Sequence, residues 1–170
     1  MKTPHFKIEH QDETLSFDSI KEVLVGFVKV NEAKGILFVK IETEEVSFSD
    51  EQIKEFERLD KYPLSYTFDY AIAEVENLQV DIGELKHLIG KSIQFESDGA
   101  AVLYVKAHFD INENKILIEQ EGDEYVLTWT GVTDDINYYD ERAKPNRIQI
   151  RTPIKLMEFG SADEYYEMEE

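Results

Sequence analysis

The sequence predicts an α+β fold built mainly on antiparallel sheet, and three observations lead to this prediction. Short β-rich runs recur at hairpin spacing between turn residues, most clearly over residues 92–131. Helical spacing of apolar residues is confined to two segments, about 50–60 and 82–89. Hydrophobic residues make up 42% of the 170 residues, which is enough for a core. We therefore expect about seven or eight mostly antiparallel strands, with two short helices against one face.

The first strands read as a possible edge strand followed by a hairpin. Residues 5–10 alternate between apolar and polar side chains. Residues 22–30 and 36–42 are rich in β-formers and flank residues 31–35, a turn that ends in glycine. The two longer runs therefore predict an antiparallel hairpin.

Capping signals locate both predicted helices. Ser49 and Gln52 form a capping box, in which each side chain hydrogen-bonds the backbone amide of the other residue. The apolar face that follows consists of Ile53, Phe56 and Leu59. A similar box over residues 81–84 and a glycine at the C-cap position, Gly90, predict the helix at 82–89.

The stretch over residues 92–131 contains four short β-rich runs with turn residues between them. We expect these runs to form one continuous antiparallel meander at the centre of the fold. The residues expected to enter the core from this meander are Phe95, Leu103, Val105, Leu127 and Trp129.

The last part of the chain reads as a strand followed by a tail. Residues 147–159 begin with strict alternation, and Pro153 favours an edge strand or a bulge because proline cannot donate to a ladder. Residues 161–170 read as a mobile acidic tail. The predicted organisation is a single α+β domain over residues 1–160 and an acidic C-terminal tail over 161–170.

Composition limits the compartment and the partners. The chain has 37 Asp and Glu against 18 Lys and Arg, a net charge of −19, and it has no cysteine. Such a charge disfavours binding to nucleic acid or to an anionic membrane and favours a basic partner. No apolar leader or membrane-length apolar run is present. We expect a cytoplasmic protein that is a monomer or simple dimer.

Catalytic and metal-binding motifs are weak in this sequence. The four histidines, His5, His10, His87 and His108, have neither the spacing of zinc ligands nor a recognisable nucleophile beside them. Residues 110–121 resemble a calcium loop in their Asp and Asn spacing, but Lys115 occupies the glycine position. We interpret this segment as a hairpin turn, and we expect no cofactor and no metal.

The spacing of charges near the C-terminus stands out. Residues 116–141 contain no Lys or Arg, whereas residues 142–155 contain five bases and no acid. Two interpretations remain open. The bases can neutralise the acids from a neighbouring strand, or the acids and aromatics can bind a basic partner. The predicted partner-binding residues are Glu121, Asp123, Glu124, Asp134, Asp135, Tyr138, Tyr139, Asp140 and Glu141.

The function that these properties favour is non-catalytic binding. An inhibitor or immunity-type protein that occludes a basic partner, such as a toxin enzyme, suits a small acidic domain of this kind, because acidic surfaces can imitate phosphates. An alternative is an accessory or scaffold subunit that uses an open sheet edge. A small-ligand-binding or hydrolytic domain is a third hypothesis, because carboxylate pairs are recognised by geometry and not by spacing.

Overall fold

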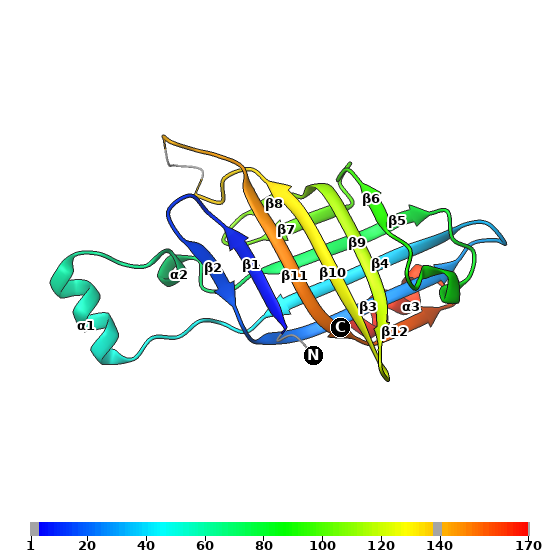
Figure 1. The fold of residues 1–170 in the computed structure, drawn as a ribbon, viewed down its shortest axis with the longest axis horizontal. Helices are drawn as coiled ribbons and strands as arrows, with labels where there is room; N and C mark the ends of the chain where they lie inside the picture. Colours follow the sequence, from blue (N-terminus) through cyan, green and yellow to red (C-terminus); the bar gives the residue numbers. More distant parts are fainter. Residues whose placement is uncertain (1–3, 138–140, 170) are drawn as a thin grey trace.

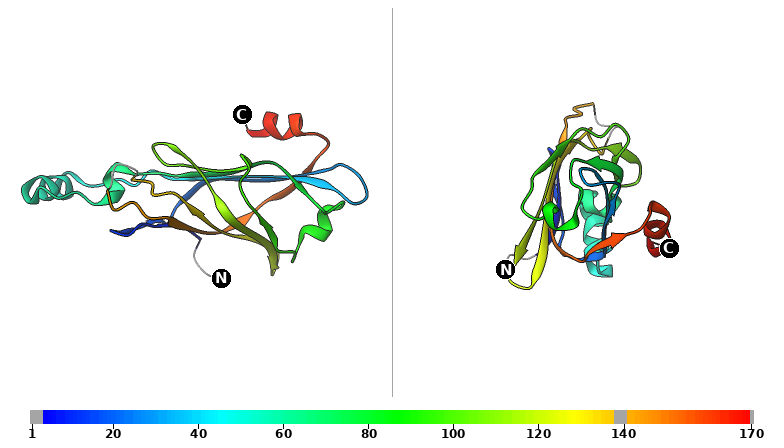
Figure 2. Two further views of the ribbon diagram at one scale, coloured as in Figure 1. Left: turned by 90° about the horizontal axis from the view of Figure 1, so that it is seen from above. Right: turned by 90° about the vertical axis from the view of Figure 1, so that its right-hand side faces the viewer.

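Two six-stranded sheets that face each other dominate the structure (Figures 1 and 2). The computed structural model describes residues 4–137 and 141–169. Sheet A has the strand order β2-β1-β11-β10-β9-β6, and sheet B has the order β12-β3-β4-β5-β7-β8. Every pair of neighbouring strands in these two sheets is antiparallel except β12 with β3. The α+β class with mostly antiparallel sheet is therefore confirmed.

The strands of sheet A are β2 (Thr14–Phe17), β1 (His5–Glu9), β11 (Asn146–Ile154), β10 (Glu124–Thr133), β9 (Asn112–Glu121) and β6 (Ile93–Phe95). The strands of sheet B are β12 (Leu156–Phe159), β3 (Ile20–Lys29), β4 (Gly35–Thr43), β5 (Ile72–Val80), β7 (Ala101–Tyr104) and β8 (His108–Asp110). The predicted strand number was too low. The strands β2, β6, β7, β8 and β12 have only three or four residues, too few for a reliable alternating pattern.

The core lies between the sheets because alternate side chains of each strand point inward. Phe6 of β1 and Leu37 of β4 are fully buried there. Trp129 of β10 is also fully buried, and its indole nitrogen donates to Asn114 Oδ1 at 2.9 Å. Of the five core residues predicted from the meander, four are buried and Phe95 is half-buried; the buried ones are Leu103, Val105, Leu127 and Trp129.

Three short connections carry the chain from one sheet to the other. Asp18 and Ser19 join β2 to β3, Ile111 alone joins β8 to β9, and Lys155 alone joins β11 to β12. Figure 1 shows the strands of sheet A crossing those of sheet B, so these connections act as corners between crossed sheets. The β3–β4 hairpin that the sequence predicted is present in sheet B.

Residues 92–131 do not form the predicted continuous meander. β6, β9 and β10 belong to sheet A, whereas β7 and β8 form a hairpin in sheet B. A turn at Asp98 and Gly99, both with positive φ (43° and 84°), stands where the chain leaves sheet A. β7 then pairs with β5, and β6 pairs with β9. Hairpin spacing indicates where a chain turns, but it does not indicate which strand becomes the partner.

The first predicted helix is confirmed, and the second is confirmed only in part, because it is shorter than predicted, is a 3₁₀ helix and has no side-chain cap. α1 spans Asp50–Leu59, with both hydrogen bonds of its capping box present. The second segment contains only one 3₁₀ turn, η1 (Leu85–Leu88), and Asp81 pairs with Lys34 at 3.2 Å. A Cβ at Gly83 would lie 2.1 Å from the Glu32 carbonyl oxygen, so the backbone is held against the β3–β4 turn there. A four-residue helix, α2 (Leu64–Thr67), was not predicted.

The C-terminal segment, predicted as a mobile tail, contains helix α3 (Ala162–Glu169). Figure 2 shows α3 on the outer side of sheet B. Tyr165 is buried and stacks on Phe38 with ring centroids 4.5 Å apart. The Ser161 hydroxyl accepts from the Glu164 amide, and Glu164 accepts from the Gly160 amide. None of the helices within residues 4–137 and 141–169 combines the length and apolar character needed to span a membrane.

Pro153 does not mark an edge strand, because β11 lies between β1 and β10. The described ladder between β1 and β11 ends at the pair His5 and Arg151, two residues before the proline. Pro153 itself faces Val126 of β10. Pro153 therefore lies beyond the last described residue pair between β11 and β1. Because proline has no amide hydrogen, this position avoids the loss of a hydrogen bond between these two strands.

Candidate protein-binding surfaces

The structure divides the predicted partner-binding residues into two groups at opposite ends of β10. Glu121, Asp123 and Glu124 lie at the β9–β10 turn, whereas Asp134 and Asp135 follow the other end of β10. Ten residues of strand separate the groups by roughly 30 Å. Glu141 is exposed. Tyr138, Tyr139 and Asp140 lie outside the described residues, so a single contiguous patch of the predicted set is not formed.

The β9–β10 turn keeps most of its negative charge. Arg151 of β11 reaches Glu121 across β10, with Nη2 2.5 Å from Oε1. Asp123 and Glu124 are exposed, and neither carboxylate has a hydrogen-bonding or ion-pair partner among the described residues. The basic strand therefore neutralises one acid of this turn and leaves the other two facing solvent.

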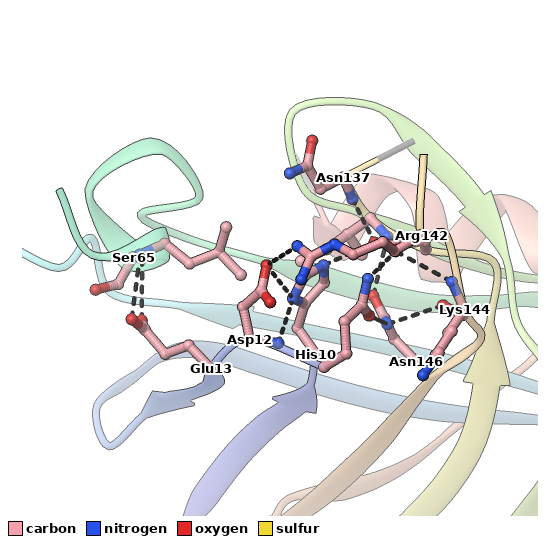
Figure 3. A network of polar contacts seen from close by, with 12 residues as sticks. His10, Asp12, Glu13, Ser65, Asn137, Arg142, Lys144 and Asn146 are labelled. Carbon is pink, nitrogen blue, oxygen red and sulfur yellow. Dashed lines mark hydrogen bonds and ion pairs between the residues drawn. The ribbon is translucent and has the colours of Figure 1, made fainter. Parts of the chain in front are cut away.

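Asp135, by contrast, is buried and belongs to an internal network, whose members His10, Asn137 and Lys144 are labelled in Figure 3. Its Oδ2 atom accepts from Gln11 Nε2 at 2.6 Å and from the Lys144 amide at 3.2 Å. Its Oδ1 atom accepts from the Asn137 amide at 2.9 Å. Burial alone would raise the pKa of Asp135, but these hydrogen bonds and the nearby His10 lower it below its ordinary value. Both oxygens of the Asp135 carboxylate are used internally, so this residue is not free to bind a partner.

His10 is the second buried member of this network. Its Nδ1 atom accepts from the Asp12 amide at 3.1 Å, so a neutral ring carries its proton on Nε2. Nε2 lies 2.9 Å from Asp135 Oδ1, but it forms no hydrogen bond there. The His10 and Asp135 side chains are 0% and 1% exposed, so neither can reach a substrate in solvent. The pair suits a structural role better than acid–base catalysis.

Further contacts join the β1–β2 turn to the β10–β11 loop. Asp12 pairs with Arg142 at 2.8 Å. Asn146 Nδ2 donates to Gln11 Oε1 at 3.5 Å, and Asn146 Oδ1 accepts from the Ile136 amide within the loop at 2.9 Å. The neighbouring Glu13 carboxylate accepts from the Leu64 amide at 3.2 Å, at the start of α2 (Figure 3). The Glu13 bonds to the Leu64 and Ser65 amides hold this end of sheet A against residues 44–71, which we call the arm.

The arm connects β4 to β5 and projects beyond both sheets (Figure 1). Its base is held by backbone hydrogen bonds: Thr43 N to Ala71 O at 3.0 Å and Val46 N to Asp69 O at 2.7 Å. α1 contains no buried residue. The sequence predicted that this helix packs on a sheet face. That expectation is wrong, because α1 lies at the far end of the arm.

Four aromatic rings form a separate cluster in the arm. Phe56 lies 5.2 Å from Phe48, 5.9 Å from Tyr62 and 6.2 Å from Tyr66, measured between ring centroids. None of the four belongs to either hydrophobic cluster of the sheets. Desolvation, followed by the charge of Glu57 and the neighbouring Tyr66, raises the pKa of the Tyr62 phenol above its ordinary value. The aromatic arm was missed in the sequence because the apolar face of α1 was assigned to the core.

Other candidate sites use their polar groups internally or remain shallow. Asn112 Oδ1 accepts from the Ser97 amide at 2.9 Å, so this member of the calcium-like segment has a protein partner. An open hollow of about 640 Å³ over β9 and β10 has the cations Lys115 and Arg147 in its lining. A smaller one of about 240 Å³ contains His108 and Glu74. Within residues 4–137 and 141–169, no three His, Cys, Asp or Glu side chains are grouped as metal ligands would be.

Comparisons with known proteins provide no family assignment. The chain matches no family model, no curated protein and no solved structure. The functional argument therefore depends on the surfaces described above.

Proposed function

We propose that the chain is a cytoplasmic, non-catalytic binding protein that occludes a basic protein partner. An inhibitor or immunity-type protein that neutralises a toxin enzyme acts in this way. The observation that carries the proposal is the solvent-facing charge of the β9–β10 turn. Asp123 and Glu124 are exposed and unpaired among the described residues, even though the basic strand β11 lies beside β10.

The charge of the whole chain supports the same proposal. A net charge of −19 attracts a basic protein from a distance and repels nucleic acid and anionic lipid. If the partner is a nuclease, its active site is built to attract phosphates, and carboxylates can occupy such a site. A monomer or simple dimer of this domain is large enough to cover an active-site entrance.

A second candidate function is that of an accessory or scaffold subunit. The open edges of the sheets favour it, because β2 and β6 end sheet A and β12 and β8 end sheet B. An unpaired edge offers backbone groups to a strand of another chain. The two functions differ in consequence, since occlusion abolishes the activity of the partner and scaffolding preserves it.

The test is capture of the partner followed by a direct assay. Tagged protein is incubated with extract of its native host, and captured proteins are identified, purified and measured for binding and for their own activity. The proposal expects a basic protein whose activity falls in proportion to the complex formed. Capture of an acidic partner, or of a partner that stays fully active in the complex, would contradict occlusion. A gel shift with duplex DNA at physiological salt serves as the control and should show no binding.

A further inference from the structure

The aromatic arm offers a surface that nothing in the described chain covers. Among the large hydrophobic residues exposed in the described parts of the chain are Leu59, Tyr62 and Tyr66 of the arm, at 55%, 44% and 42% exposure. Ile53 and Phe56 continue the same apolar face of α1 and are half-buried. Contiguous apolar surface of this kind is a common mark of an interaction site.

We propose that this arm is the docking element of the chain and that it binds an apolar patch, rimmed by Lys or Arg, on a basic protein. The inference rests on the proposed function and adds where the partner is bound and what its surface must contain. The exposed acids of the β9–β10 turn, at the other end of β10, contribute to attracting a basic partner and not to the contact with the arm. Large aromatic side chains are the usual anchors of such interfaces, because they bury much area with few rotatable bonds.

The arm is prepared for binding before a partner arrives. Its helix begins with a complete capping box, formed by Ser49 and Gln52, and ends at Asp60 in the left-handed conformation. The aromatic rings contact one another, and backbone hydrogen bonds hold the base of the arm to the sheets. A pre-organised surface loses less conformational freedom on binding than a flexible segment does.

Charge determines which partner fits. Residues 44–62 contain seven acids and three bases. Arg58 is already paired with Glu55. Glu57 lies beside Ile53 on the edge of the apolar face, as expected from 100° per residue, and has no cationic partner among the described residues. A basic rim would complement these acids, whereas the arm of a second copy would repel them.

The position of the arm agrees with a docking role. Figure 1 and the left view of Figure 2 show the arm along its length, and in both α1 lies at one end of the molecule, away from the two sheets. A partner can therefore reach the apolar face without moving any strand. The Asp134 end of β10 lies on the same side of the molecule as the arm, because the β1–β2 turn contacts both: Glu13 bonds to the start of α2, and Gln11 bonds to Asp135.

A defined probe tests the arm directly. The probe is a synthetic amphipathic helical peptide of leucine and lysine, and its matched control has glutamate in place of lysine. Titration of the labelled peptide into the full chain should give binding for the lysine peptide only. The double variant Leu59→Ser, Tyr62→Ser should weaken binding by about tenfold or more, as expected for the loss of an interface anchor.

Matched variants separate this effect from unfolding. Val30→Ser removes an apolar side chain of equal exposure, 55%, from the β3–β4 turn and should leave the affinity unchanged. Circular dichroism of the arm variant should match that of the parent. Equal affinity of the arm variant and the parent, or no binding of the lysine peptide, would overturn the arm as docking element.

Three further results would overturn the proposal in favour of another occupant or site. Tighter binding to anionic vesicles of phosphatidylserine than to the peptide indicates a membrane. A dimer that the arm variant loses in sedimentation indicates a second copy. If the arm variant still captures the host partner with parental affinity, the arm is not the docking element, but the proposed function stands. If the parent protein captures no basic protein, the proposed function itself is contradicted.

Discussion

Asp135 and His10 show how one buried pair can organise the end of a sheet. The carboxylate accepts from a side chain in the β1–β2 turn and from two backbone amides around the β10–β11 loop. Removing such an acceptor leaves buried donors without a partner, which costs more than the bond contributes when present. The exposed neighbour Asp134 has no such role. Two adjacent aspartates therefore have different functions, and only their surroundings distinguish them.

The variant Asp135→Asn tests this role. Because the pKa of Asp135 is lowered in the folded protein, its ionised form stabilises the fold above the ordinary value of 3.8, and this stabilisation is lost as the pH falls through the folded pKa. We expect the variant to be about 1–3 kcal/mol less stable near neutral pH. The difference should shrink below about pH 4. Denaturant unfolding at several pH values measures it, with Asp134→Asn as the control, and a difference independent of pH would argue against this role.

Trp129 makes a second prediction at the scale of the residue. Its ring is fully buried, and its indole nitrogen satisfies Asn114. Trp129→Ala should lower the free energy of unfolding by about 3–5 kcal/mol, from the cavity and the lost hydrogen bond. Thr128→Val, on the other face of β10, is the control and should change it by less than about 1 kcal/mol. An unchanged denaturant midpoint for the alanine variant would show that the assignment of Trp129 to the core is incorrect.

At the scale of the element, the arm is a small unit stabilised by its own contacts. α1 has no buried residue, so its capping box and the aromatic cluster carry most of its local stability. Ser49→Ala should destabilise the helix by about 1 kcal/mol without lowering the stability of the sheets. Hydrogen exchange should quicken for amides of residues 50–60 and remain unchanged in β10. Ser47→Ala, an exposed residue outside the box, should affect neither region. Faster exchange throughout the sheets would indicate that the arm and the core unfold together.

Elements defined by local signals were the ones that the sequence predicted well. α1 begins at its capping box, and the β3–β4 hairpin follows from a short turn between two β-rich runs. The continuous meander failed because β7 pairs with β5, a strand that precedes the whole segment. The C-terminal helix was missed although Ser161 and Glu164 have the spacing of a capping box, and the Ser161 hydroxyl accepts from the Glu164 amide. Pairing between distant strands is a property of the whole chain and leaves no short pattern.

On the scale of the whole molecule, the sequence predicted which acidic residues are present, but it did not predict where the fold places them. The acids of residues 116–141 could be counted in the sequence, yet Asp135 is buried against Gln11, which is 124 residues away. The arm was predicted as a helix, but its projection from the sheets depends on where β4 and β5 end. Helical spacing indicates an apolar face and not what that face meets. The location of charge and apolar surface therefore had to come from the fold.

The β9–β10 turn separates the two original interpretations of the acidic segment, because its three acids have different surroundings. Glu121 is paired with Arg151, whereas Asp123 and Glu124 are exposed and unpaired among the described residues. Replacing Glu121 by Gln should cost stability, about 0.2–1 kcal/mol for a partly exposed pair. The double variant Asp123→Asn, Glu124→Gln should leave stability within about 0.5 kcal/mol of the parent.

The same two variants should affect association with a basic partner in the opposite order. Exposed acids steer a partner over a Debye length of about 8 Å at physiological ionic strength, so their loss acts mainly on the association rate. The double variant should slow association and flatten its dependence on salt, while dissociation stays near the parental rate. Glu121→Gln should change the association rate less, because Arg151 already offsets that charge.

Stopped-flow measurements at several salt concentrations compare the association rates of the two variants and the parent. If the double variant associates as fast as the parent at low salt, the acids of this turn do not steer the partner, and the main support for a basic partner at this surface is lost.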